Sequence, residues 1–228
     1  MKKNLPFSIC LALFLALWCN KSEAQYYQMA NTLTNVITPA ISGSGSYQGF
    51  VEAGYSHTLN PYPGDFVEIS TSQGYRYKSW FFMGVGLGAD ILFARYKESW
   101  ETDWYPTHPT PDKAYTKKAV MVPLFTDFRF NIGAPPAQGK VSFFLDLKVG
   151  CSFLLANKYI EIGDGYLTNR EYFFLRPSLG VRIPVSKNHP KQAVNIGVSY
   201  KLLTSNYWNG YNNNITLQAL GASLGFEW

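Results

Sequence analysis

Three histidines are the residues of this chain whose type could support acid–base chemistry. His57, His108 and His189 stand far apart, and their spacing matches no zinc-binding motif. A lone histidine can still act as a general base when an acid orients its ring and a serine lies within hydrogen-bonding distance. His57 is the candidate for that role, because it falls on the outward side of a predicted strand near its end. No spacing specifies its serine, so a surface histidine without a catalytic role is the simpler interpretation.

A glycine-rich stretch offers a second kind of chemistry. Residues 84–89, GVGLGA, match the G-x-G-x-x-A pattern of dinucleotide-binding turns. That pattern binds a pyrophosphate only where a helix follows the glycines. Here the alternation of side-chain types continues without a break to Phe93, so the stretch predicts a strand in which glycines make room for larger neighbours. The sequence therefore predicts no catalytic residue, no cofactor and no metal site.

These glycines belong to the most regular stretch of the chain, residues 80–96. Its alternate residues form two surfaces, because successive side chains of a strand point to opposite faces. One surface is apolar throughout, and the other carries the glycines and Asp90. This contrast predicts a strand with lipid on one side and a narrow polar lumen on the other. Since backbone polar groups find no partner in lipid, such a strand requires a closed barrel.

The same alternation recurs along the chain. Short connections, at 78–79, 133–139 and 187–191, alternate with the remaining connections between predicted strands. Two of those remaining connections are long, 98–117 and 157–170. The predicted fold is an all-β, closed, eight-stranded antiparallel transmembrane barrel with short periplasmic turns and longer extracellular loops. Its predicted strands are residues 47–59, 65–77, 80–97, 118–132, 140–156, 171–186, 192–204 and 213–228.

Two prolines interrupt this pattern. Pro123 and Pro177 each remove a donor from the hydrogen-bond ladder, and prolines in sheets are usually confined to edges or bulges. A closed barrel has no edge, so we expect a bulge at each proline.

Residues 1–24 have the pattern of an export signal peptide. Lys2 and Lys3 precede an apolar run that is too short to span a bilayer, and a small-x-small cleavage site ends at Ala24. We therefore divide the chain into three parts. They are a signal peptide at 1–24, a pre-barrel segment at 25–46 that forms a short helix or a linker, and the barrel at 47–228.

The composition of the chain excludes several classes of protein. Removal of the signal leaves Cys151 as the one cysteine, so no internal disulfide forms and a disulfide-stapled domain is excluded. The net charge of +5 is spread along the chain, and no basic block indicates nucleic-acid binding. Aromatic residues make up 17% of the chain, which is ample for the interfacial belts of a membrane barrel.

Charged residues fall on the inner face of the predicted strands in equal numbers. Charges away from water are tolerated when they are paired, and an eight-stranded barrel is just wide enough for side chains to fill it. The sequence therefore predicts a salt-bridged plug rather than an open conduit. The six acids and six bases of this lumen charge network are Glu52, Glu68, Asp90, Asp127, Asp146 and Glu227 with Arg76, Arg129, Lys148, Arg176, Arg182 and Lys201.

From residue 47 to Trp228 the sequence resembles the small eight-stranded outer-membrane barrels of Gram-negative bacteria, of the OmpA transmembrane domain and OmpX type. The resemblance lies in the architecture and in a last strand that alternates up to a terminal aromatic residue. It implies a monomeric integral protein of the outer membrane, surrounded by lipid and lipopolysaccharide. It also implies an assembly signal, formed by Leu224, Phe226 and Trp228, for the barrel assembly machinery.

The predicted extracellular loops are rich in aromatic residues, which are common where loops recognise sugars or proteins. The candidates for such contacts are Trp100, Trp104, Tyr105 and Tyr115 in the loop at 98–117, and Tyr207 and Trp208 in the loop at 205–212. The leading hypothesis is a non-enzymatic barrel with an envelope-structural or surface-interaction role. The alternatives are an enzyme acting on lipid or lipopolysaccharide of the outer leaflet, and a narrow pore for ions or small solutes.

Overall fold

The structure is a computed structural model that describes residues 45–59, 64–77, 80–97, 114–133, 140–156, 160–162, 165–167, 171–186, 191–208 and 212–228. Residues 45–228 form one compact unit. The predicted signal peptide and all but the last two residues of the predicted pre-barrel segment lie outside the described residues.

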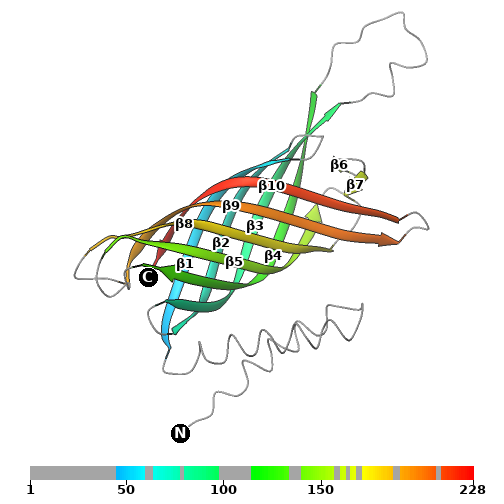
Figure 1. The fold of residues 1–228 in the computed structure, drawn as a ribbon. Helices are drawn as coiled ribbons and strands as arrows, with labels where there is room; N and C mark the ends of the chain where they lie inside the picture. The colour runs from blue at the N-terminus through cyan, green and yellow to red at the C-terminus, as the bar shows by residue number, and fades with distance from the viewer. Residues whose placement is uncertain are drawn as a thin grey trace, which may run out of the picture. The chain divides into compact units, whose positions relative to one another are not determined.

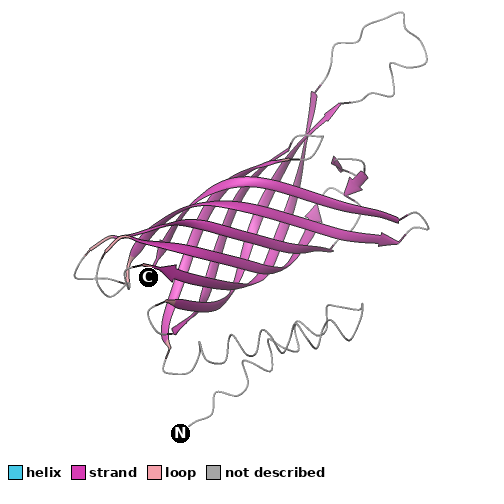
Figure 2. Cartoon of the chain, viewed as in Figure 1, coloured by secondary structure: helices cyan, strands magenta, loops and turns pink. Residues whose placement is uncertain are grey.

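Eight long strands close into an antiparallel barrel in the order β1-β10-β9-β8-β5-β4-β3-β2 (Figure 1). The predicted closed eight-stranded antiparallel barrel is confirmed. Every described element is a strand, a loop or a turn (Figure 2), and no helix among the described residues is long and apolar enough to cross a membrane. The barrel strands are β1 (Ser46–Thr58), β2 (Gly64–Tyr77), β3 (Phe81–Lys97), β4 (Ala114–Ile132), β5 (Ser142–Ala156), β8 (Glu171–Pro184), β9 (Ala193–Trp208) and β10 (Asn212–Glu227).

The two ends of the barrel differ in their connections. We call one end the turn end, because the β2–β3, β4–β5 and β8–β9 connections lie there together with the start of β1 and the end of β10. The opposite end, the loop end, carries the connections of β3 to β4 and of β5 to β8. The latter contains β6 (Ile160–Ile162) and β7 (Gly165–Leu167), a two-stranded sheet that the sequence analysis missed.

Two barrel strands extend further toward the loop end than predicted. Strand β4 begins at Ala114, and its Tyr115 pairs with Tyr96 of β3. Strand β9 runs to Trp208, which pairs with Asn212 of β10. The placement of Tyr115, Tyr207 and Trp208 in loops was therefore wrong, because ladder pairing continues through polar and aromatic residues that a search for apolar alternation does not count.

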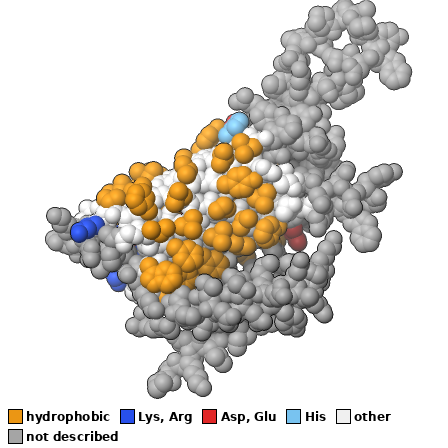
Figure 3. Space-filling model, viewed as in Figure 1, with side chains coloured by type: hydrophobic (Ala, Val, Ile, Leu, Met, Phe, Trp, Pro, Cys, Tyr) orange, Lys and Arg blue, Asp and Glu red, His pale blue; other side chains and the backbone are white. Residues whose placement is uncertain are grey.

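The polarity of this barrel is the reverse of that of a soluble one. Hydrophobic side chains gather over the visible face of the barrel in Figure 3, whereas most of the described charged side chains of the strands point inward and are buried. An apolar exterior around a polar interior is the arrangement of a membrane barrel. Large exposed apolar residues include Val51, Val67, Ile69, Val85, Leu87, Ile91, Leu124, Leu145, Leu179, Ile196, Val198, Leu220 and Leu224.

Phe81 departs from the expected exposure of the outward face. It lies in the same phase of β3 as the exposed Val85, yet only 1% of its surface is exposed. Its ring packs against Tyr77, Trp80 and Phe130, at centroid distances of 6.4, 5.6 and 5.1 Å. These rings form part of an aromatic belt at the turn end. Tyr47, Tyr75, Phe226 and Trp228 add further ring pairs to it.

The two prolines are accommodated without the predicted bulges. Pairing of β4 with β3 skips Val122 and Pro123, and pairing of β8 with β9 skips Arg176 and Pro177, while the register is the same on both sides of each gap. Each proline still pairs normally on its other side. Since a residue's N–H points to one neighbouring strand, the missing donor interrupts one ladder alone. A register shift does occur between Val120 and Met121, where β4 pairs with β5.

Inward glycines make room for aromatic rings, as predicted for the glycine-rich stretch. A Cβ atom at Gly86 would overlap the ring of Phe125, and one at Gly180 would lie 2.6 Å from the ring of Phe144. Real Cβ atoms essentially never approach other atoms so closely. The rings can therefore lie over the neighbouring strand on the inner wall only because the paired positions there have no side chain.

The inverted polarity predicts how stability depends on the outer surface. Leu87, in the middle of β3, is 50% exposed, and Leu87→Lys should lower the free energy of unfolding by ~2–4 kcal/mol because an ammonium would enter the hydrocarbon region. Val141 at the turn end is 58% exposed, and Val141→Lys should cost only ~0–1 kcal/mol because the ammonium reaches the interface. Equilibrium unfolding in urea with phospholipid vesicles measures both losses. Equal losses would contradict a membrane-spanning β3.

Candidate functional site in the barrel interior

All twelve predicted lumen charges are buried inside the barrel. All but Asp127 form three groups, each held by a carboxylate that interacts with two cations. The first group lies around Glu52 of β1, which accepts hydrogen bonds from Arg129 of β4 and Lys148 of β5. Asp146 lies beside them, with one oxygen 3.3 Å from Arg129 Nη2 and 3.7 Å from Lys148 Nζ. The group therefore bridges the lumen from β1 to β4 and β5.

The second group is built on Glu68 of β2. One carboxylate oxygen lies 2.8 Å from Arg176 Nη1 of β8, and the other lies 2.5 Å from Lys201 Nζ of β9. The hydroxyl of Ser56 also donates to this carboxylate, at 2.6 Å. Lys201 makes a second ion pair with Asp90 of β3, at 2.7 Å. Two acids and two bases thus share one interlocked network.

The third group lies at the turn end, around Glu227 of the last strand. Its Oε1 accepts from Arg182 Nη2 at 2.7 Å and from Arg76 Nη2 at 3.2 Å, and Asn195 lies 3.5 Å from Oε2. One carboxylate therefore serves two guanidinium groups, which come from β2 and β8.

Aromatic rings support the cations of the lumen from their other sides. The guanidinium carbon of Arg129 lies 4.2 Å from the ring centroid of Phe50 and 4.6 Å from that of Phe144. Lys201 Nζ lies 4.4 Å from the centroid of Phe66. A cation over an aromatic face is stabilised by the ring quadrupole, and more so where water is excluded. The inward phenylalanines therefore belong to the charge network as well as to the packing.

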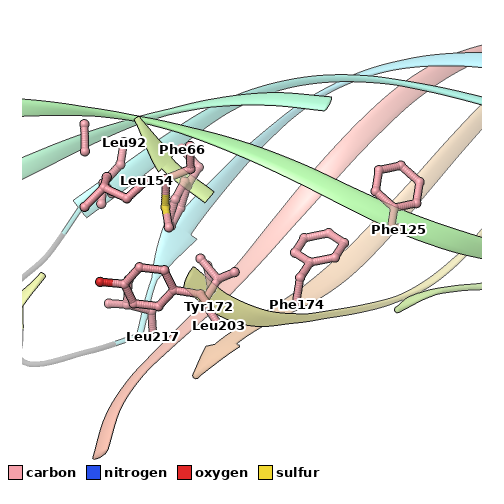
Figure 4. Close-up of a cluster of buried hydrophobic side chains, with 11 residues drawn as sticks. Phe66, Leu92, Phe125, Leu154, Tyr172, Phe174, Leu203 and Leu217 are labelled. Atoms are coloured by element: carbon pink, nitrogen blue, oxygen red, sulfur yellow. The ribbon is translucent and has the colours of Figure 1, made fainter. Parts of the chain in front are cut away.

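An apolar layer lies inside the barrel as well, and the sequence analysis did not identify it. Figure 4 shows part of this cluster of buried side chains, which projects inward from β2, β3, β4, β5, β8, β9 and β10. The signal that could have found it is the same period of two, since these residues share the inward phase with the charges. The cluster consists of Phe66, Leu92, Ala119, Met121, Phe125, Leu154, Tyr172, Phe174, Leu203, Leu217 and Ala219.

The sequence matches no protein-family model and no curated protein. Among solved structures it is similar to the N-terminal barrel domain of OprF from Pseudomonas aeruginosa, with 13% identity and a TM-score of 0.40, over 81% of this chain and 100% of that one. It is similar to OprG from the same organism, with 10% identity and a TM-score of 0.44, over 82% and 99%. It is also similar to the outer-membrane enzyme PagL, with 12% identity and a TM-score of 0.45, over 76% of this chain and 97% of that one. Identities this low concern the fold alone.

Asp127 differs from the other acids of the interior. Its position pairs with Lys148 across the β4–β5 ladder, as Arg129 pairs with Asp146. The Arg129–Asp146 pair forms, in line with the register, but Lys148 reaches Glu52 and Asp146 instead of Asp127. Among the described residues, no hydrogen bond reaches either carboxylate oxygen of Asp127. Register on the sheet therefore identifies neighbours, but it does not decide which of them form ion pairs in a narrow lumen.

His57 lies on the exterior near the loop end and has the acid that the sequence did not reveal. Its Nδ1 lies 2.8 Å from Asp65 Oδ1, and the Tyr55 hydroxyl donates to the same oxygen at 2.6 Å. The ring is 55% exposed. Among the described residues, no serine or threonine hydroxyl bonds to this imidazole.

The remaining candidates differ in how far the structure describes them. Leu224, Phe226 and Trp228 are exposed on the outer side of β10 and just beyond it. Trp100, Trp104 and Tyr105 lie outside the described residues, as do His108 and His189.

The ion pairs of the Glu52 group predict that truncating a single side chain strongly lowers the stability of the barrel. Arg129→Ala removes a cation from two buried carboxylates, Glu52 and Asp146, and should lower the free energy of unfolding by about 3–5 kcal/mol. Lys140→Ala removes an exposed cation at the turn end and should cost only ~0–1 kcal/mol. Urea unfolding of both variants in vesicles provides the comparison. A loss for Arg129→Ala no larger than for the control would indicate a water-filled interior.

Proposed function

We propose that this protein is a non-conducting and non-enzymatic barrel of the outer membrane, which acts in envelope structure or surface interaction through its loop end. The observation that carries the proposal is the filling of the interior. Charged groups of β1, β2, β3, β4, β5, β8, β9 and β10 meet one another in the lumen, and an apolar layer adds a second obstruction. A side chain that spans the lumen to reach its partner occupies space that a continuous column of water would need.

The energetics of the lumen favour a plug that stays closed. Separating a buried ion pair leaves an unpaired charge away from water, which costs several kcal/mol per pair. The apolar cluster could be hydrated only by exposing Phe66, Phe125 and Phe174 to water, although all three are buried. Opening would therefore break both layers at once. A permanent plug fits an anchor or adhesion role better than a transport role.

The proposed orientation places the turn end in the periplasm. Both ends of the barrel segment lie there, and its aromatic belt suits a membrane interface. The outward Leu224, Phe226 and Trp228 of the closing strand are the proposed assembly signal. The loop end then faces the cell exterior, where the connections at 98–113 and 157–170 would meet surface partners, with lipopolysaccharide around the barrel.

A second candidate function rests on His57. An imidazole held by Asp65 on the lipid-facing surface has the base and the orienting acid of a hydrolase. The loop end would place it at the outer leaflet, so its substrate would be a lipid or the lipid part of lipopolysaccharide. We rank this candidate second because no nucleophile among the described residues contacts the imidazole.

Planar-bilayer recording tests the closed lumen. The purified wild-type protein should insert without steady conductance, because ion pairs and apolar side chains fill the lumen. Phe125→Ala/Phe174→Ala, which removes two rings of the apolar cluster that lie 5.7 Å apart, should at most add brief openings, since the charge layer remains. Large, stable, ohmic steps from the wild-type protein would refute the plug and favour the pore.

Mass spectrometry of outer-membrane lipids separates the two candidate functions. Cells that express the wild-type protein, His57→Ala or no protein should show the same lipid species, because no nucleophile among the described residues contacts the imidazole. A lipid species that appears with the wild type and disappears with His57→Ala would establish the enzyme. In that case a control substitution of the exposed Tyr75 at the opposite end should leave the new species unchanged.

A further inference from the structure

At the turn end of the lumen, several buried donors have no hydrogen-bond partner among the described residues. Arg76 of β2 is 6% exposed and uses Nη2 for Glu227. Its Nε and Nη1 are buried and have no hydrogen-bond partner among the described residues. At neutral pH the guanidinium keeps its charge, so deprotonation does not relieve this situation. The structure thus holds a permanent cation with one of its three nitrogens satisfied.

Two other polar side chains at this end also lack hydrogen-bond partners among the described residues. Asn131 of β4 and Ser142 of β5 are buried, and neither the amide of Asn131 nor the hydroxyl of Ser142 has a partner among the described residues. Ser142 pairs across the ladder with Arg182, the second guanidinium bound to Glu227. Unsatisfied donors from β2, β4 and β5 therefore project into the same end of the lumen.

Two acids that could approach this end of the lumen are already engaged with cations, and Asp127, whose oxygens have no partner, stands further from the turn end than Asn131 on β4. Glu227 is the acid that already serves Arg76 and Arg182. Glu52 is engaged with Arg129 and Lys148. Toward the middle of the barrel the rings of Phe50 and Phe82, 4.7 Å apart, lie beside this group, since Phe50 pairs with Glu227 and Phe82 with Arg76 across the ladders. Among the described residues, Glu227 is therefore the one carboxylate that contacts Arg76, and an oxyanion entering through the turn end would complete the hydrogen bonds of this guanidinium.

We propose that the turn end of the barrel is a binding site for a small oxyanion, a phosphate or a carboxylate, centred on Arg76 with Asn131 and Ser142 as additional donors. Charge-assisted hydrogen bonds from a guanidinium to such oxygens are among the strongest in proteins, and Arg is the residue best suited to them. A cation is excluded by Arg76 and Arg182, and a neutral ligand would leave the charge of Arg76 unbalanced. In the proposed orientation the site opens to the periplasm and lies below the plug, so it is independent of conduction.

The test uses the full mature chain, refolded in a maltoside detergent that carries no phosphate. Inorganic phosphate and acetate are titrated separately at constant ionic strength, with chloride as the reference salt. At least one of them should raise the unfolding temperature above the chloride value, since a ligand that binds the folded state stabilises it. Calorimetry gives the dissociation constant. The arm that responds distinguishes a phosphate site from a carboxylate site.

Three variants decide whether Arg76 is the centre. Arg76→Gln should weaken binding by about tenfold or more, because a charge-assisted hydrogen bond is lost. Ser142→Ala should weaken it less, and Lys140→Gln, which removes an exposed cation at the same end, should leave it unchanged. Should Arg76→Gln fail to fold, Ser142→Ala and Asn131→Ala carry the test. The proposal is overturned if neither anion exceeds chloride, as expected when only water fills the site, or if binding survives all substitutions of these three donors.

Discussion

The whole structure depends on one constraint, that every backbone amide facing lipid must find its partner within the protein. The barrel meets it by pairing its first strand with its last. The ladder of β1 with β10 runs from Phe50 and Glu227 to Thr58 and Ala219, and Gly49 and Trp228 extend it by two reciprocal bonds of 3.1 Å. Pro123 and Pro177 show that the ladders tolerate only a local interruption. Each interrupts the ladder on the side where its N–H is missing and keeps the register on both sides.

Closure with eight strands then limits the space inside. A barrel of this size holds side chains and little else, so each inward residue must fit against residues from the opposite wall. Arg129 reaches from β4 to Glu52 on β1, with Phe50 and Phe144 at its faces. The rings themselves require glycines opposite them, as Phe144 requires Gly180. Charge pairing, aromatic packing and glycine placement are therefore three solutions to one problem of volume.

The alternation of side-chain types made the fold and the inward phase of the charges predictable. Glu52 and Lys148 could each be assigned to the interior because their strand neighbours are apolar on the other face. Their mutual contact could not be predicted, because it crosses the lumen between residues 96 apart, and no sheet register relates them. Asp65 differs, because the register of β1 with β2 pairs it directly with His57, so the exact register of this hairpin would have indicated the contact. Inward apolar residues such as Phe66 and Leu92 were missed because hydrophobicity alone does not distinguish lipid from a packed lumen.

The distance along the chain between ion-pair partners has a consequence for biogenesis. Arg76 belongs to the first hairpin of the barrel, and its acceptor Glu227 lies in the last strand, 151 residues later. Glu52 of β1 likewise has its partners, Arg129 and Lys148, in the later strands β4 and β5. A hairpin that entered the bilayer by itself would carry unpaired charges into the hydrocarbon layer, because its counterions belong to later strands. Insertion is therefore cooperative across the entire polypeptide, and the strands must collect in a sheltered, hydrated place before any of them crosses the membrane.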